Sequence, residues 1–127
     1  MKVLHVIARM NVGGTATYLF NLLEGLENSK VETKLIIGSV PRNEKEDSRV
    51  EQLDYQRIPG LSRAIAPVRD LLARRKLWEI VKDYQPDLIH CHTFKAGLLV
   101  RSKKTSIPII HTFHGHHLYD PDYGKFA

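Results

Sequence analysis

The sequence contains a single cysteine, Cys91, among its 127 residues. One thiol cannot form an internal disulfide, so a small disulfide-stabilised secreted scaffold is excluded and a reducing compartment is favoured. No stretch approaches the roughly 18 consecutive apolar residues of a membrane-spanning helix. The opening residues are too short and too interrupted for a signal peptide. These absences together predict a cytoplasmic protein.

The sequence also lacks the usual patterns of nucleic-acid-binding proteins. It has no helix-turn-helix pattern, no zinc-finger spacing and no aromatic residues interleaved with basic ones. The net charge of +5 and the pI near 9.4 nevertheless permit an anionic partner. We therefore expect a phosphorylated ligand or an acidic membrane surface as partner, and no nucleic acid.

What the sequence does contain is an alternation of apolar runs and amphipathic stretches typical of one soluble domain. The hydrophobic content of 43% and charged content of 26% are ordinary for such a domain. Strands are predicted at residues 3–8, 31–39, 55–58, 88–91 and 107–110, the third of them at a sheet edge. Helices are predicted at 15–28, from 67 to about 84, and at 95–104, with a polar loop at 41–48 and a short helix within 50–55.

Strands that alternate with helices indicate an α/β fold: a Rossmann-like parallel sheet with helices on both faces, joined by right-handed crossovers. Nothing after residue 110 would close such a sheet. We therefore expect the 127 residues to form one incomplete half of a larger architecture, in a truncated chain.

The helix predicted from Pro67 combines apolar and basic residues. Its expected buried stripe opens with Val68, Leu71 and Leu72 and continues through Leu77, Ile80, Val81 and Tyr84. Its basic residues are Arg69, Arg74, Arg75 and Lys76. The simpler interpretation is a solvated helix face. The alternative is a helix that lies on an anionic membrane surface.

Two glycines, Gly13 and Gly14, lie between the first predicted strand and its helix. Glycine permits a tight turn there, and the free N–H groups of the helix start attract phosphate or sugar oxygens. The pair is not the G-x-G-x-x-G of dinucleotide-binding proteins. A plain structural turn is the alternative.

Six of the seven histidines follow two predicted strands: His90 and His92, then His111, His114, His116 and His117. Histidine is a common metal ligand, so a zinc site and a metal hydrolase are alternatives that stoichiometric zinc would support. Against them, His90 and His92 share a strand face, and no helix aligns His114 with His117. Hydrogen bonding to hydroxyls and phosphate is favoured, with His114 best placed before Gly115, although some histidines, His90 especially, could simply be packed.

Two further side chains near these strand ends carry chemistry. Lys95 opens a predicted helix, where its ammonium could meet a phosphate or a substrate carboxylate, or remain solvated. Cys91 has no evident base partner, which argues against a thiol nucleophile.

Three segments of the sequence resemble the retaining GT-B glycosyltransferases of family 4. Residues 12–26 (VGGTATYLFNLLEGL) resemble their first loop and helix, and residues 85–99 (QPDLIHCHTFKAGLL) resemble their central segment. Residues 109–116 (IIHTFHGH) resemble the block that follows. The resemblance covers almost the whole chain. It departs after Leu99, where family members usually have a longer alanine-rich helix.

The resemblance implies the amino-terminal, acceptor-side half of an enzyme in which two Rossmann-like domains face a cleft. Such an enzyme transfers a sugar from a nucleotide-sugar to a hydroxyl of a saccharide or lipid-linked acceptor, with retained configuration. The donor domain would be absent from residues 1–127. No metal or other cofactor is implied, because basic residues of the second domain neutralise the departing diphosphate.

The resemblance also implies roles for individual residues. His114 would lie against the transferred sugar as the catalytic candidate, and the substrate-binding candidates are Gly13, Gly14, Thr15, His92, Thr93, Lys95, Thr112, Gly115 and His116. Lipid-linked acceptors would suit a peripheral contact of Arg69, Arg74, Arg75 and Lys76 with the inner membrane face. The competing hypothesis is a non-catalytic Rossmann-like subunit that pairs with a separate donor-domain protein or with a membrane.

Overall fold

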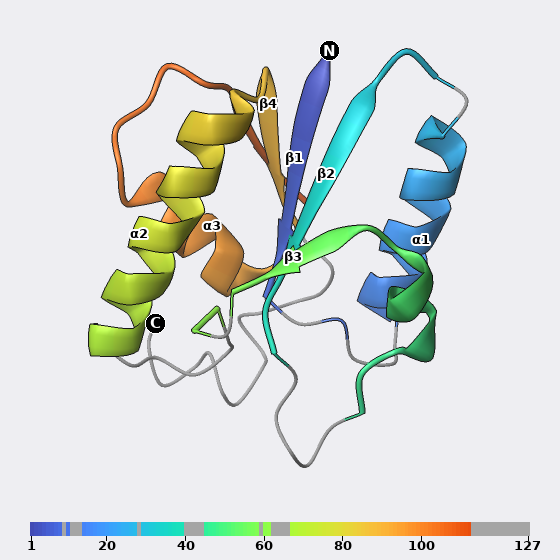
Figure 1. Cartoon of the computed structure of the whole chain (residues 1–127), viewed down its shortest axis with the longest axis horizontal. Helices are drawn as coiled ribbons and strands as arrows, with labels where there is room; N and C mark the ends of the chain where they lie inside the picture. Colours follow the sequence, from blue (N-terminus) through green and yellow to red (C-terminus); the bar gives the residue numbers. More distant parts are fainter. Residues whose placement is uncertain are drawn as a thin grey trace.

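The computed structural model describes residues 1–8, 10, 14–27, 29–39, 45–58, 60–61 and 67–112, with the side chain of Thr15 outside the description. Five strands are present: β1 (Lys2–Ile7), β2 (Glu32–Ile37), β3 (Tyr55–Arg57), β4 (Leu88–Cys91) and β5 (Ile109–His111). The helices are α1 (Gly14–Leu26), the 3-10 helix η1 (Ser48–Gln52), α2 (Pro67–Tyr84) and α3 (Phe94–Arg101). Strands and helices alternate as the sequence predicts (Figure 1).

The strands form one parallel sheet in the order β3-β2-β1-β4-β5. In the centre, His5 of β1 lies opposite Leu35 of β2 and His90 of β4. The chain order reverses on either side of β1, because the chain first builds outward to β3 and then crosses to β4 on the other side. In parallel sheets of this kind, ligands bind at the carboxyl ends of the strands beside that reversal.

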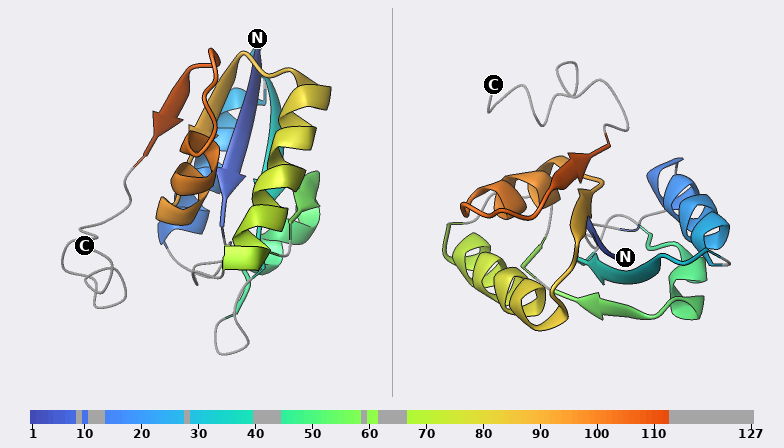
Figure 2. Two further views of the ribbon diagram at one scale, coloured as in Figure 1. Left: turned by 90° about the vertical axis from the view of Figure 1, so that its left-hand side faces the viewer. Right: turned by 90° about the horizontal axis from the view of Figure 1, so that it is seen from above.

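Helices cover both faces of the sheet: α1 lies on one face, and α2 and α3 lie on the other (Figures 1 and 2). Alternate residues of β1 point to opposite faces of the sheet. Leu4 and Val6 belong to the cluster shared with α2 and α3, whereas Ile7 belongs to the cluster shared with α1 and η1. The expected Rossmann-like α/β fold with helices on both faces is thereby confirmed.

The boundaries of α2 have local causes. Pro67 is tolerated as the first residue because its missing N–H would have no helical partner there. The helix ends where Gln85 adopts a left-handed backbone with φ 53° while its N–H still donates to Val81 O, and Pro86 follows. No described helix is both long and apolar enough to cross a membrane.

The predicted apolar stripe of α2 is wrong in its first two turns. Val68, Leu71 and Leu72 are 74%, 52% and 58% exposed. The buried stripe instead passes through Ala73, Leu77, Ile80 and Val81. The spacing of three and four residues, extended backwards from Ala73, reaches Asp70, so a charged residue opens the stripe and the apolar neighbours point elsewhere.

Candidate functional site

Side chains gather at the carboxyl ends of β4 and β5, the two strands that most of the histidines follow. His92 and Thr93 follow β4 directly, and Thr112 follows β5. The backbone holds these ends together: His92 N–H donates to Val6 O of β1, and Thr112 N–H donates to Cys91 O, each over 3.0 Å. The ends of β4 and β5 therefore bring His92, Thr93 and Thr112 to one edge of the sheet.

Three histidines, two of them buried and His90 half-buried, form a cluster on the α1 side of the sheet. His5 and His92 are each only 1% exposed, and His5 Nδ1 lies 3.0 Å from His92 Nε2 in a hydrogen bond. His90 Nε2 shares a 2.6 Å hydrogen bond with the Thr112 hydroxyl. The rings of His90 and His92 lie 4.0 Å apart, and Tyr18 of α1 lies 6.0 Å from His92.

His5 is the member of this cluster that sequence analysis did not single out. Burial, together with the neighbouring His90, lowers its pKa from 6.5 to about 4. The ring is therefore neutral at neutral pH and can act as one donor and one acceptor. The signal that could have found it is the adjacency of the first and fourth strands, which places His5 directly opposite His90.

The ligand atoms of His5, His90 and His92 all lie within 4.8 Å of one another, so within the described residues this is the group that could hold a metal. Neutral imidazoles are suitable zinc ligands. In the arrangement present, however, the facing nitrogens of His5 and His92 are donor and acceptor to each other, so neither offers a lone pair to a metal while that hydrogen bond is kept. The geometry fits a hydrogen-bonded network.

Thr93 performs a structural task at the predicted site. Its hydroxyl accepts a hydrogen bond from Ala96 N–H and thereby caps α3, and it also accepts one from Ala8 N–H over 3.0 Å. The side chain thus ties the amino end of α3 to the end of β1, which fixes the edge on which the site is built.

Lys95 lies on the other side of the sheet, in contact with α2. It is 2% exposed, and its ammonium lies 2.7 Å from Asp70 Oδ1. One alternative that the sequence left open, a solvated Lys95 side chain, is therefore wrong. The anion that Lys95 meets here is a protein carboxylate.

Gly14 is the first residue of α1 and is exposed. A Cβ atom at this position would meet nothing within 4 Å. Packing therefore does not require glycine at this position. Thr15 follows in the same turn. Gly13, His114, Gly115 and His116 lie outside the described residues.

Cys91 is completely buried, and burial raises the pKa of its thiol to about 12. A neutral buried thiol is a poor nucleophile, which agrees with the sequence-based argument against such a role. Arg69 lies in the first turn of α2, next to Gly60 beyond the end of β3, whereas Arg74, Arg75 and Lys76 lie further along the helix. Arg69, Arg75 and Lys76 are exposed, and Arg74 donates from Nε to the Ser102 hydroxyl over 2.6 Å.

Comparisons with known proteins agree with this architecture. A UDP-Gal:alpha-D-GlcNAc-diphosphoundecaprenol alpha-1,3-galactosyltransferase from Escherichia coli is 27% identical over 119 residues, which span 91% of this chain and 30% of that protein. The apo structure of the lipopolysaccharide outer core galactosyltransferase WaaB matches with a TM-score of 0.73 and 17% identity over 97% of this chain and 36% of WaaB. UDP-GlcNAc 2-epimerase from Neisseria meningitidis matches with a TM-score of 0.65 and 18% identity over 98% of this chain and 36% of that structure.

The structural likenesses support the Rossmann-like fold, and the chain spans about a third of the length of these proteins. The family follows from the sequence itself. The sequence model described as Glycosyltransferase Family 4 matches residues 12–126, which is nearly the whole chain. The protein therefore belongs to Glycosyltransferase Family 4.

Proposed function

We propose that this chain is the acceptor-side part of a retaining glycosyltransferase, which transfers a sugar from a nucleotide-sugar to a hydroxyl of a saccharide or lipid-linked acceptor. The observation that carries the proposal is the family match over residues 12–126. The gathering of His92 and Thr112 at the carboxyl edge of the sheet is consistent with a ligand site there. This chain corresponds to about a third of the length of its relatives. The residues that complete such an enzyme would lie outside that third.

In this proposal the start of α1 approaches phosphate or sugar oxygens. Helix N–H groups without partners and the positive end of the helix dipole both favour an anion. Gly13, Gly14 and Thr15 would form this contact. The surroundings of Gly14 itself support it, because no described atom lies within 4 Å of the position that a Cβ would take there.

The histidine cluster would hold hydrogen-bonding groups in position for the substrate and would not transfer protons. The hydrogen bond to His5 holds the His92 ring, and the bond to Thr112 holds the His90 ring. Preorganised donors of this kind stabilise developing charge without reorganising during the reaction. His114, with Gly115 and His116 beside it, would contact the transferred sugar, and Lys95 would act with Asp70 by fixing the start of α3 beneath His92 and Thr93.

The relatives suggest the class of substrates. The name of the Escherichia coli relative specifies a UDP-Gal donor and a diphosphoundecaprenol-linked saccharide acceptor. We propose a nucleotide-activated hexose and a lipid-linked saccharide as the corresponding pair here. UDP-galactose is the first donor to test.

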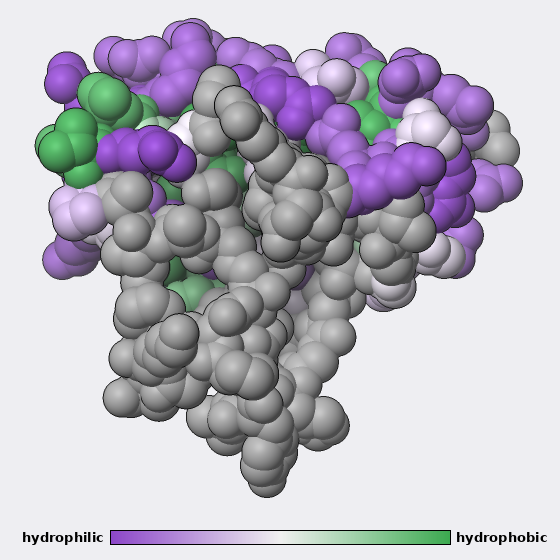
Figure 3. Space-filling model, turned by 90° about the horizontal axis from the view of Figure 1, so that it is seen from below, coloured by the Kyte–Doolittle hydropathy of each residue, from purple (hydrophilic) through white to green (hydrophobic). Residues whose placement is uncertain are grey.

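A lipid-linked acceptor implies work at a membrane surface, and α2 has features suited to that. Val68, Leu71 and Leu72 are exposed, and so are Arg69, Arg75 and Lys76 of the same helix. Seen from below, an apolar group lies among hydrophilic side chains at the α2 side of the molecule (Figure 3). We propose that this end of α2 contacts the cytoplasmic face of an anionic membrane.

We propose that the transfer needs no metal and no other cofactor. The described histidines are arranged for hydrogen bonding, and basic residues outside this chain would neutralise the departing diphosphate. Treatment of the intact enzyme with EDTA should therefore leave the transfer rate unchanged. Stoichiometric zinc whose removal abolishes transfer would favour the metal-dependent alternative instead.

The decisive test measures sugar transfer by the intact enzyme from radiolabelled UDP-galactose and related donors to a lipid-linked acceptor. The variant His114→Ala should lower kcat by about two orders of magnitude with little change in unfolding midpoint. The neighbouring variant His117→Ala, to which no role is assigned, is the matched control. Equal kcat in wild type and His114→Ala would contradict the assignment.

The same assay addresses the non-catalytic alternative. The 127 residues alone should give no transfer, and detectable turnover by them would overturn that part of the proposal. An intact protein that binds a separate donor-domain protein tightly, yet transfers no sugar from any donor tested, would instead be a binding subunit.

A further inference from the structure

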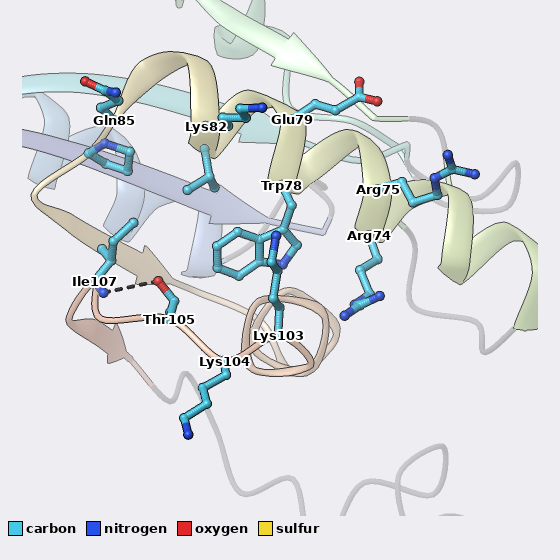
Figure 4. Close-up of a pocket in the computed structure, with 12 residues that line it drawn as sticks. Arg74, Arg75, Trp78, Glu79, Lys82, Gln85, Lys103, Lys104, Thr105 and Ile107 are labelled. Atoms are coloured by element: carbon cyan, nitrogen blue, oxygen red, sulfur yellow. Dashed lines mark hydrogen bonds between the residues drawn. The ribbon is translucent and has the colours of Figure 1, made fainter.

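A second, strongly basic hollow lies on the outside of the α2–α3 layer. This groove has a volume of about 850 Å³ and runs between the carboxyl-terminal half of α2 and the segment that joins α3 to β5 (Figure 4). Its principal lining residues are Arg74, Arg75, Trp78, Lys82, Lys103 and Lys104. We call it the basic groove. Its volume falls within the range of ligand pockets.

The charge of the basic groove is unbalanced. Five of its side chains are cationic and Glu79 is its one acidic member. In the described part of the chain, none of the five cations forms an ion pair with a carboxylate. Arg74 is held in place by two hydrogen bonds to Ser102, one to its hydroxyl and one to its carbonyl oxygen. Cations gathered without counter-charges favour an anionic ligand.

Trp78 adds an apolar surface within this charged setting. The Lys103 ammonium lies 5.2 Å from the centroid of its indole ring, so a cation already covers the ring. The indole N–H is buried and has no hydrogen-bond acceptor among the described residues. A ligand oxygen could supply that acceptor, and displacement of Lys103 towards an anion would expose the ring to the rest of the ligand.

The basic groove is separate from the candidate site. Gln85 and Pro86, which precede β4, and Thr105 and Ile107, which precede β5, line it. It therefore opens towards the amino ends of these strands, whereas His92 and Thr112 lie at their carboxyl ends. A ligand in the groove would not occupy the position proposed for the transferred sugar.

We propose that the basic groove binds a phosphate or diphosphate ester whose remaining part packs against Trp78. Guanidinium groups pair with phosphate oxygens in a bidentate manner, and lysines add point charges from the opposite wall. The volume exceeds the needs of the phosphate group alone and accommodates the group that it carries. This proposal stands independently of the sugar-transfer function.

Trp78 is the only tryptophan in the sequence, so its fluorescence reports on the groove directly. We would titrate the 127-residue chain with inorganic pyrophosphate and follow the emission of Trp78. A saturable change is expected, with an apparent affinity that falls as KCl is added. The double variant R75Q/K104Q should weaken binding roughly tenfold.

The matched control is K30Q/K45Q, which removes the same charge from two exposed lysines outside the groove. It should bind pyrophosphate as the wild type does. Circular dichroism would establish that both variants fold. Equal weakening by the two double variants, or an unchanged affinity in folded R75Q/K104Q, would overturn the proposal.

A second titration identifies where the phosphate group comes from. Vesicles of phosphatidylglycerol and phosphatidylcholine in equal parts would shift the Trp78 emission, and pyrophosphate would reverse the shift, if a lipid headgroup occupies the groove. Vesicles without effect, together with saturable pyrophosphate binding, would indicate a soluble phosphate ester. No saturable response to either probe would overturn the proposal.

Discussion

The Lys95 ammonium lies 2.7 Å from Asp70 Oδ1, and this ion pair joins the start of α3 to the first turn of α2. The Lys95 side chain is only 3% exposed and that of Asp70 is 18% exposed. Both charges have therefore lost most of their hydration, which makes the pair sensitive to the removal of either partner. Because Lys95 follows the Thr93 cap by two residues, the pair also fixes the segment that carries His92 and Thr93.

Replacing the lysine should therefore destabilise the protein. In Lys95→Met the Asp70 carboxylate loses the cation that faces it within a poorly hydrated environment. We expect the free energy of unfolding, measured in urea, to fall by about 3 kcal/mol.

The control is the double variant Lys95→Met/Asp70→Leu, which removes both charges. It should recover part of the loss, because replacing a buried ion pair with apolar residues is often tolerated. A single variant that unfolds at the wild-type urea concentration would show that the pair contributes little.

The same pair illustrates what sequence patterns can predict. The strands followed from apolar runs, and β4 begins and ends where its pattern indicates. The buried face of α2 could not be predicted in this way. Val68, Leu71 and Leu72 have the spacing of a buried stripe, but they are exposed, and Asp70 opens the buried stripe instead. A charged residue belongs to a buried stripe only when its partner lies opposite, and that partner is distant in sequence.

The candidate site likewise has features that could be predicted from the sequence and features that could not. The position of His92 at a strand end could be predicted, since parallel strands share an edge. Its hydrogen bond to His5 could not, because it requires the order of the strands and the ring orientation together. Thr93 and Lys95 were expected at the substrate, and the structure reveals contacts with Ala8 and Asp70 that spacing alone does not predict.

The buried His5 should make stability depend on pH. Its pKa is lowered to about 4 in the folded protein from 6.5, so the unfolded chain binds the proton more readily. The stability that comes from keeping His5 neutral is fully present above pH 6.5. As the pH falls towards 4, the free energy of unfolding decreases by up to about 3 kcal/mol. Urea unfolding at a series of pH values between these limits measures it.

His5→Asn is the appropriate comparison for that series. Asparagine retains a polar group near the position of Nδ1 but does not titrate in this range. The variant should lose stability less steeply than the wild type as the pH falls from 6.5. Parallel curves for the two proteins would show that His5 is not the source of the pH dependence.

Gly38 should tolerate no side chain. It follows β2, and a Cβ atom there would collide with the backbone carbonyl oxygens of Leu61 and Ala8, which cannot move aside as a flexible side chain can. Gly38→Ala should lower the free energy of unfolding by at least about 3 kcal/mol.

Gly25→Ala provides the contrast for this substitution. Gly25 lies within α1, and a Cβ atom there would meet nothing within 4 Å. Because alanine favours a helix over glycine, this variant should be more stable by up to about 1 kcal/mol. Similar effects of the two substitutions would contradict the close approach of the backbone at Gly38.

The exposed apolar residues of α2 should contribute to membrane binding. Leu71→Gln/Leu72→Gln removes apolar area that is already in water, so the fold should lose little stability. Sedimentation with vesicles that contain phosphatidylglycerol should show binding at least about tenfold weaker than that of the wild type, because apolar insertion and charge attraction act together. Leu98→Gln, at an exposed position of α3, is the matched control and should bind as the wild type does. If both variants bind vesicles equally well, α2 is a solvated face, and the membrane contact must be sought elsewhere in the protein.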